Sequence, residues 1–173
     1  DVGLGAEPPV GWVAHSGLTH DDGDVCYEYH APAGAPEVFA AGDVARWPHP
    51  RLDTLVRAEH WTNAADQARC VAHNIAHPAA RTPYLPSDYV WSDQYDWKLQ
   101  IVGRSAPGDT RTLVGDLAAE RPRAAELCAD AEGRLSAAVV LNWPKGLIQC
   151  RRLIAERGTA SRARDLLAGS LAG

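Results

Sequence analysis

Hydrophobic and polar positions follow two different periodicities along the chain, and the change falls near residue 80. Before that point, apolar side chains recur at helical spacing from Ala64 to Ile75, which predicts a helix. We place the amino-terminal cap of this helix at Asn63, with the acidic Asp66 in its first turn. We expect it to end near His77, because Pro78 cannot continue a helix.

After residue 80 the pattern is typical of strands, since polar and apolar side chains alternate. We expect strands over residues 89–95, 98–103 and 111–114, with a turn at 106–109. The segment 123–131 is ambiguous, because its alanine, glutamate and leucine content favours a helix. An amphipathic helix is predicted to start at Pro144 and to stop at Gly158, and a short final helix is expected over 164–167.

The first part of the chain also contains two predicted strands. The alternating segment 25–29 predicts an edge strand, and the apolar run 38–41 predicts a buried strand. The proline-containing segment 46–51 is interpreted as a loop. The buried strand would end in Gly42 and Asp43. Glycine lets a backbone approach a ligand, and open α/β sheets bind ligands at the carboxyl ends of their strands, so Asp43 could accept hydrogen bonds from ligand hydroxyls.

Composition and charge exclude several classes of function. The chain has 173 residues, a net charge of −5 and no methionine, so we expect it to be part of a longer protein. The chain has no long basic run that would favour a nucleic-acid partner and no apolar stretch with the length of a membrane span. We therefore expect a cytoplasmic chain that binds neither nucleic acid nor a membrane. The cysteines are widely separated and lack CxxC spacing, which predicts reduced thiols and no metal site. They are Cys26, Cys70, Cys128 and Cys150.

Three segments carry a resemblance to a known family. They are the FAAGD-containing segment 38–43, the segment 57–69 that begins RAEHW, and the WSDQ segment 91–94. In this order they resemble the carboxyl-terminal half of the FAD-dependent NAD(P)H reductases of ferredoxin, rubredoxin and putidaredoxin. The resemblance implies a parent enzyme that passes electrons from NAD(P)H through FAD to a ferredoxin-type iron–sulfur protein or to rubredoxin, with a homodimer left open.

The resemblance also implies a fold. Residues 84–173 are expected to form an α+β carboxyl-terminal reductase domain, with an antiparallel sheet and helices on one side. Residues 1–80 are expected to be the tail of an α/β doubly wound FAD-binding domain. In the ambiguous region, the family places a strand over 123–131, which pairs with a strand over 135–141.

Site residues follow from the same resemblance. The residues expected to bind FAD are Gly42, Asp43, Glu59, His60 and Trp61. The first turn of the following helix would stabilise negative charge on the reduced flavin. Trp91 is expected near the flavin, on the face toward the electron-transfer partner, and is our candidate for the catalytic role. For Trp61 and His60, a core tryptophan and a surface histidine are equally compatible interpretations.

Two further observations qualify this hypothesis. The run from Gly3 to Pro8 is not a GxGxxG fingerprint, so the chain lacks the glycine-rich grip on FAD pyrophosphate and on NAD. An alternative is therefore a non-catalytic interaction or assembly domain that does not bind flavin by itself. An acidic partner could be attracted by Arg46, Arg69, Arg151 and Arg152, although each is also compatible with an ordinary solvated surface.

Overall fold

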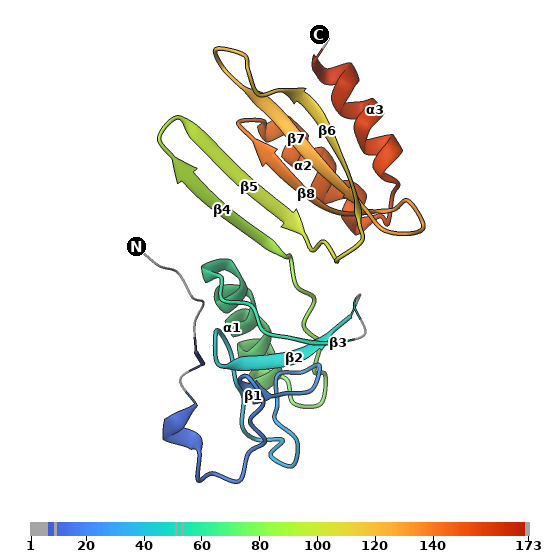
Figure 1. Ribbon diagram of the computed structural model, residues 1–173. Helices are drawn as coiled ribbons and strands as arrows, with labels where there is room; N and C mark the ends of the chain where they lie inside the picture. The colour runs from blue at the N-terminus through green and yellow to red at the C-terminus, as the bar shows by residue number, and fades with distance from the viewer. Residues whose placement is uncertain (1–6, 9, 51, 53, 172–173) are drawn as a thin grey trace. The chain divides into compact units, whose positions relative to one another are not determined.

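The computed structural model describes residues 7–8, 10–50, 52 and 54–171, and its internal contacts divide the chain into two units, residues 1–86 and 87–173 (Figure 1). The glycines at positions 3 and 5, which belong to the run discussed above, lie outside the described residues.

The second unit is built on a five-stranded antiparallel sheet. Its strands, in chain order, are β4 Tyr89–Gln94, β5 Trp97–Gly103, β6 Thr110–Asp116, β7 Arg123–Ala129 and β8 Leu135–Leu141. They lie side by side in the order β4-β5-β8-β7-β6. The strand expectations for this part of the chain are confirmed, and so is the antiparallel sheet that the resemblance implied.

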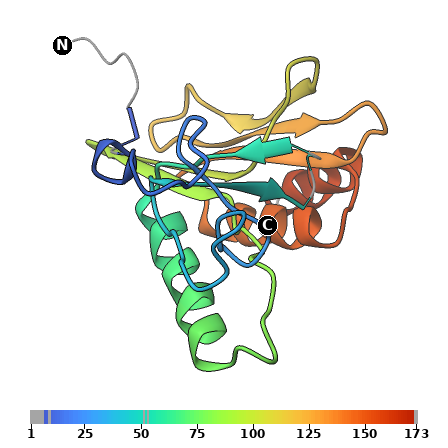
Figure 2. The same ribbon diagram turned by 90° about the horizontal axis from the view of Figure 1, so that it is seen from below.

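Helices α2 (Pro144–Ala155) and α3 (Ala160–Leu171) cover one face of this sheet (Figure 2). Helix α2 packs against β8 and β5, and α3 packs against β6 and β7. Proline at the first position of α2 fits the sequence prediction, because its missing N–H would have no partner there. The left-handed residue that follows α2 is Arg157 rather than Gly158, and the final helix is longer than expected.

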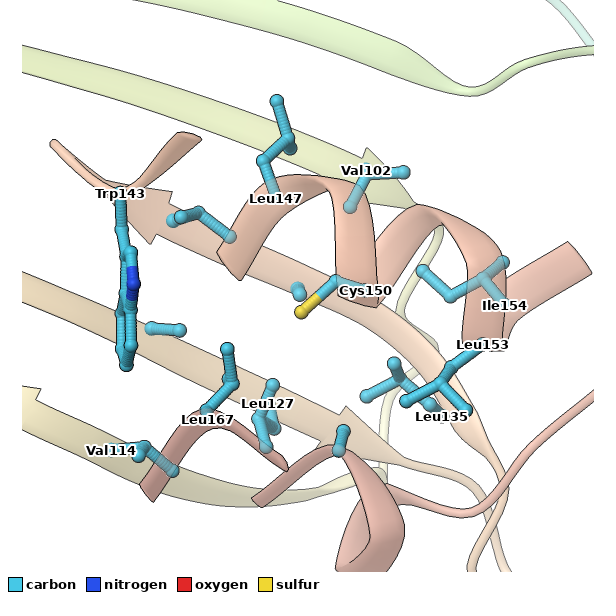
Figure 3. Packing of buried hydrophobic residues seen from close by; sticks show 14 residues of the cluster. Val102, Val114, Leu127, Leu135, Trp143, Leu147, Cys150, Leu153, Ile154 and Leu167 are labelled. Atoms are coloured by element: carbon cyan, nitrogen blue, oxygen red, sulfur yellow. The ribbon is translucent and has the colours of Figure 1, made fainter. Parts of the chain in front are cut away.

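The core of the second unit lies between the sheet and the two helices (Figure 3). Side chains from β7 and β8 meet Leu147, Cys150 and Leu153 of α2 and Leu167 of α3. Leu153 and Leu167 are fully buried, and each such side chain contributes roughly 1.5–3 kcal/mol through removal of apolar surface from water.

Residues 123–129 form a strand although their local propensity favours a helix. Leu127 and Ala125 alternate with Glu126 and contribute to the buried core, while β7 pairs with a neighbour on each side. A segment with partners on both edges gains ladder hydrogen bonds and core burial together, which outweighs a weak helix preference.

The first unit consists of a small sheet and one long helix, which are labelled in Figure 1. Its elements are a 3₁₀ turn Gly11–Val13, β1 Asp24–Val25, β2 Ala45–His49, β3 Thr54–Val56 and α1 Trp61–Ala76. Strands β1 and β2 are parallel, and β2 and β3 are antiparallel.

The strand predictions for the first unit are largely wrong. Residues 38–41 are not a strand, because the N–H of Val38 bonds within a turn and the N–H of Ala40 donates to His30 in a loop. The segment 46–51, which we interpreted as a loop, instead supplies most of β2, where Ala45, Trp47 and His49 alternate as buried residues. The expected edge strand 25–29 is paired in a ladder only over its first residue.

Helix α1 begins two residues before the predicted cap. Asn63 lies inside the first turn and is buried, where its Nδ2 donates to the carbonyl of Ala58 at 3.0 Å and its Oδ1 accepts from the hydroxyl of Tyr84 at 3.0 Å. Asn63 is therefore a core anchor rather than a cap, and no acidic residue lies in the first turn. The predicted end before Pro78 is confirmed.

A buried aromatic cluster fills the core of the first unit. The His30 ring lies 5.5 Å from Trp47 and 5.0 Å from Tyr84, measured between centroids. Its Nδ1 donates to the carbonyl of Ala40 at 3.0 Å, while its Nε2 has no hydrogen-bond partner among the described residues. Burial lowers the pKa of His30 from 6.5 to about 4, although the backbone hydrogen bond opposes part of this effect.

We therefore expect acid to destabilise the chain through His30. Because the folded pKa lies below the unfolded value, the stabilisation is complete above about pH 6.5 and is lost as the pH falls toward about 4. The slope should be close to 1.4 kcal/mol per pH unit in that range. Urea unfolding at several pH values should show that the free energy of unfolding of His30→Asn falls less steeply with acid, because asparagine does not titrate. Asparagine is chosen because it tolerates the left-handed backbone at φ 63°. An unchanged slope would contradict this.

Candidate functional site

The Gly42–Asp43 turn packs against the beginning of helix α1. The N–H of Gly42 donates to Oε1 of Gln67 at 2.6 Å, and Gln67 is fully buried. Gly42 has φ 81°, and a Cβ at this position would touch the Cβ of Ala64 at 3.5 Å. The left-handed backbone and the close helix together explain glycine here.

Asp43 occupies a different place from the one the sequence predicted. It precedes β2 instead of following a strand, so it lies at the amino end of its neighbouring strand. Its side chain is exposed. The neighbouring Gly42 contacts α1 through Gln67 and Ala64, so the turn that carries Asp43 lies against this helix.

The amino end of α1 carries the remaining candidate cofactor residues. His60 is the residue before the helix, has an extended backbone and makes no capping hydrogen bond. Trp61 begins the helix with 84% of its surface exposed, so the core interpretation of Trp61 is wrong. Glu59 is ion-paired with Arg57. An uncapped helix start carries a partial positive charge, so it can stabilise an anion.

Trp91 lies on β4 in the second unit. Its ring stacks on Tyr89, with centroids 5.8 Å apart and planes inclined by 22°. The guanidinium of Arg151, from α2, lies 5.2 Å from the centroid of the Tyr89 ring. Gln100 donates from Nε2 to the Tyr89 hydroxyl at 2.8 Å. We call Trp91, Tyr89 and Arg151 the aromatic–arginine stack.

Sequence reasoning pointed to Trp91 and Arg151 separately but missed the contacts that join them through Tyr89. Tyr89 and Trp91 share one face of β4 because they are two residues apart. Their cross-strand partners, Val102 and Gln100, lie on the face that α2 covers, and this brings Arg151 of α2 over the edge strand. The alternation in β5 indicated which residues share a face, but the position of α2 could not be obtained from the local pattern.

Each of the other candidate arginines forms an ion pair with a carboxylate of its own unit. Arg46 pairs with Asp21, Arg69 pairs with Asp66 one helical turn away, and Arg152 lies 3.8 Å from Glu156. Arg69 remains three-quarters exposed. Arg151 differs because its recorded contact is with the aromatic ring of Tyr89.

The cysteines are free thiols, and no group of three potential metal ligands occurs among the residues that the structure describes. Burial raises the pKa values of Cys26 and Cys150 to about 12, so neither thiol is a nucleophile near neutral pH. In the described part of the chain, no helix has the length and apolar character needed to cross a bilayer.

Comparison with known proteins shows which family this chain is similar to. Residues 89–168 match a family model described as "Reductase C-terminal". The chain is 33% identical over 154 residues to the ferredoxin–NAD(+) reductase component of the anthranilate 1,2-dioxygenase system of Burkholderia cepacia. The chain belongs to this reductase family and corresponds to its carboxyl-terminal portion.

Other members of the reductase family agree. Rhodocoxin reductase of Rhodococcus erythropolis is 38% identical over 116 residues, which is 67% of this chain and 26% of that protein. The ferredoxin reductase for the CYP199A2 system from Rhodopseudomonas palustris has a TM-score of 0.85 at 32% identity, over 96% of this chain and 40% of that one. The match to the Burkholderia reductase covers 89% of this chain and 37% of the relative. The chain thus spans between about a quarter and two fifths of the length of these relatives.

Proposed function

We propose that this chain is the carboxyl-terminal part of an FAD-dependent NAD(P)H:ferredoxin reductase. The observation that carries the proposal is the packing of the Gly42–Asp43 turn against the start of α1, in a chain of the reductase family. This packing joins the turn that carries the exposed Asp43 carboxylate to the helix that begins at the exposed Trp61 and has no side-chain cap. The three groups suit ribityl hydroxyls, a flat ring and negative charge, respectively.

The residues divide the work of holding and tuning a flavin. Asp43 would accept hydrogen bonds from ribityl hydroxyls. Trp61, with Glu59 and His60, would lie along the edge of the ring. The first-turn amides of α1 would stabilise negative charge that develops on the ring during reduction. FAD would supply the hydride acceptor for NAD(P)H and the single electrons for the partner, while the protein supplies orientation and electrostatics.

The aromatic–arginine stack is the proposed exit for electrons. Trp91 is 42% exposed and stacks on Tyr89, whose ring also contacts the guanidinium of Arg151 from α2. An exposed aromatic side chain beside an arginine fits a small acidic iron–sulfur protein, because complementary charge speeds the encounter and an aromatic anchor supplies contact area. Among the relatives, putidaredoxin reductase has been solved as a covalent complex with putidaredoxin, at a TM-score of 0.73 and 30% identity.

Flavin analysis of the full-length protein tests this function. We expect purified protein to contain one FAD per chain, and we expect anaerobic NAD(P)H to bleach the flavin spectrum. A protein that lacks flavin after purification and does not take it up from solution would favour the alternative, an interaction or assembly domain. Such a domain would bind its partner without a change in the flavin spectrum.

Residues 1–173 alone are expected not to retain FAD at micromolar concentration. In a complete dinucleotide-binding domain, a glycine-rich loop and a helix amino terminus grip the pyrophosphate. This chain has the proposed ribityl and ring contacts without a recognisable loop of that kind. Equilibrium dialysis of the isolated chain against FAD is the measurement. Stoichiometric retention would contradict the expectation and reveal a phosphate site of another construction.

A further inference from the structure

The Arg57 side chain connects three segments of the first unit that are far apart in sequence. Its Nε and Nη2 donate to Oδ1 of Asp22 at 3.2 and 3.0 Å. Its Nη1 donates to the carbonyl oxygen of Asp43 at 3.4 Å and to Oε1 of Glu59. The Arg57 side chain is only 10% exposed. One guanidinium thus contacts the 21–24 turn, the Gly42–Asp43 turn and the segment that leads into α1.

Close packing around this guanidinium holds the three segments in register. Gly23 has φ 119°, and a Cβ there would lie 2.7 Å from the carbonyl oxygen of Val44 and 3.1 Å from Cδ of Arg57. The N–H of Asp24 donates to the same Val44 carbonyl at 2.7 Å. The Asp43 turn is therefore fixed on one side by Arg57 and β1, and on the other by the buried Gln67 of α1.

The charge on Arg57 is permanent. Hydrogen bonds to Asp22 and Glu59 raise the pKa of Arg57 above its usual value, with Asp22 the larger contribution. A planar, charged fork can engage two carboxylates and a carbonyl at once, which a lysine ammonium on a flexible stem cannot do with the same geometry.

We propose that Arg57 is a positioning residue for the flavin site. It makes no proposed contact with FAD. It holds the Asp43 turn and Glu59 in one fixed arrangement at the start of α1, so that the Asp43 carboxylate is placed for the ribityl hydroxyls before FAD arrives. Pre-organisation of this kind raises affinity because less ordering is needed on binding. This inference rests on the proposed function.

A double-mutant cycle on FAD affinity tests it in the full-length protein. The variants are Arg57→Ala, Asp43→Ala and the double variant, each titrated as apoprotein with FAD. Arg111→Ala is the matched control, since Arg111 also forms an arginine–carboxylate pair, with Glu126 in the second unit. We expect Arg57→Ala to weaken FAD binding about tenfold in the native background and less than about twofold in the Asp43→Ala background, because the carboxylate proposed to bind the ribityl hydroxyls is then absent. The control should bind FAD as the native protein does.

The outcomes separate this inference from the function on which it rests. Equal losses in both backgrounds, or no loss for Arg57→Ala, would overturn the positioning role even if Asp43→Ala weakens FAD binding. Native-like affinity in Asp43→Ala would instead overturn the role of Asp43 in the proposed function. If Arg57→Ala fails to fold, the same cycle is run with Arg57→Lys, which keeps the charge without the fork. That variant should also lose affinity only when Asp43 is present, and equal losses would again overturn the proposal.

Discussion

Trp91→Ala in the full-length protein should slow electron delivery to the iron–sulfur partner about thirtyfold, which corresponds to about 2 kcal/mol for loss of an interfacial tryptophan. Reduction of the flavin by NAD(P)H should stay within about twofold of the native rate, because hydride transfer does not use the partner surface. The reason is the stack with Tyr89 and Arg151, which presents the indole ring at an exposed edge of the sheet. Stopped-flow flavin reduction and steady-state partner reduction measure the two steps separately.

The neighbouring strand offers a matched control for Trp91. Trp97 is 44% exposed, against 42% for Trp91, and belongs to the same β4–β5 hairpin. It lies on the opposite face, because Trp91 pairs with Gln100 and side chains alternate between faces along β5. Trp97→Ala should not reproduce the selective loss. Equal losses in both steps for Trp91→Ala would indicate a packing defect, and a loss confined to flavin reduction would refute the partner-side role.

Asp43→Ala should weaken FAD binding about tenfold to a hundredfold, since a charge-assisted hydrogen bond is worth roughly 1.5–3 kcal/mol. The fold should be retained, because the carboxylate is exposed and the turn is held by its backbone through Gly42. Titration of the apoprotein with FAD, with thermal unfolding as the check on folding, gives the result. Asp165→Ala, an exposed carboxylate on α3, is the control for loss of one negative charge. Unchanged affinity would return Asp43 to the class of solvated loop residues.

The second unit could be predicted from sequence because its elements are locally consistent. Buried and exposed positions alternate in the second half of β5, and α2 has a proline at its start. Segment 123–129 was the exception, since its alanines and leucine have no strand preference of their own and only the partners on both sides make them a strand. The resemblance, rather than propensity, resolved it.

The first unit was harder, because its structure depends on non-local partners. Pro48 makes the segment 46–51 look like a loop. Pro48 nevertheless lies in β2, where its side chain is exposed and those of Trp47 and His49 are buried. Asn63 has the chemistry of a cap, but Tyr84 and the Ala58 carbonyl bind it in the core. The apolar run 38–41 suggests a buried strand, yet its backbone bonds to loops and turns.

The candidate site shows the same division. The residues proposed to bind FAD, and Trp91, could be found in the sequence, because they lie in the FAAGD, RAEHW and WSDQ segments. The arrangement could not be found, because the contacts of Gly42 with Gln67, of Arg57 with Asp43, and of Arg151 with Tyr89 each join distant segments. These contacts arise from tertiary packing, so they cannot be predicted from the local periodicity of the sequence.

The central claim is that this chain belongs to an enzyme that moves electrons from NAD(P)H through FAD to an acidic iron–sulfur protein. The most direct measurement is anaerobic reduction of a purified ferredoxin-type protein by NAD(P)H and catalytic amounts of the full-length protein, followed at rising salt concentration. We predict FAD-dependent reduction whose second-order rate falls as salt screens the charge of Arg151 from the acidic partner. A flavin that NAD(P)H reduces but that passes no electrons to any such partner, at any ionic strength, would contradict the account.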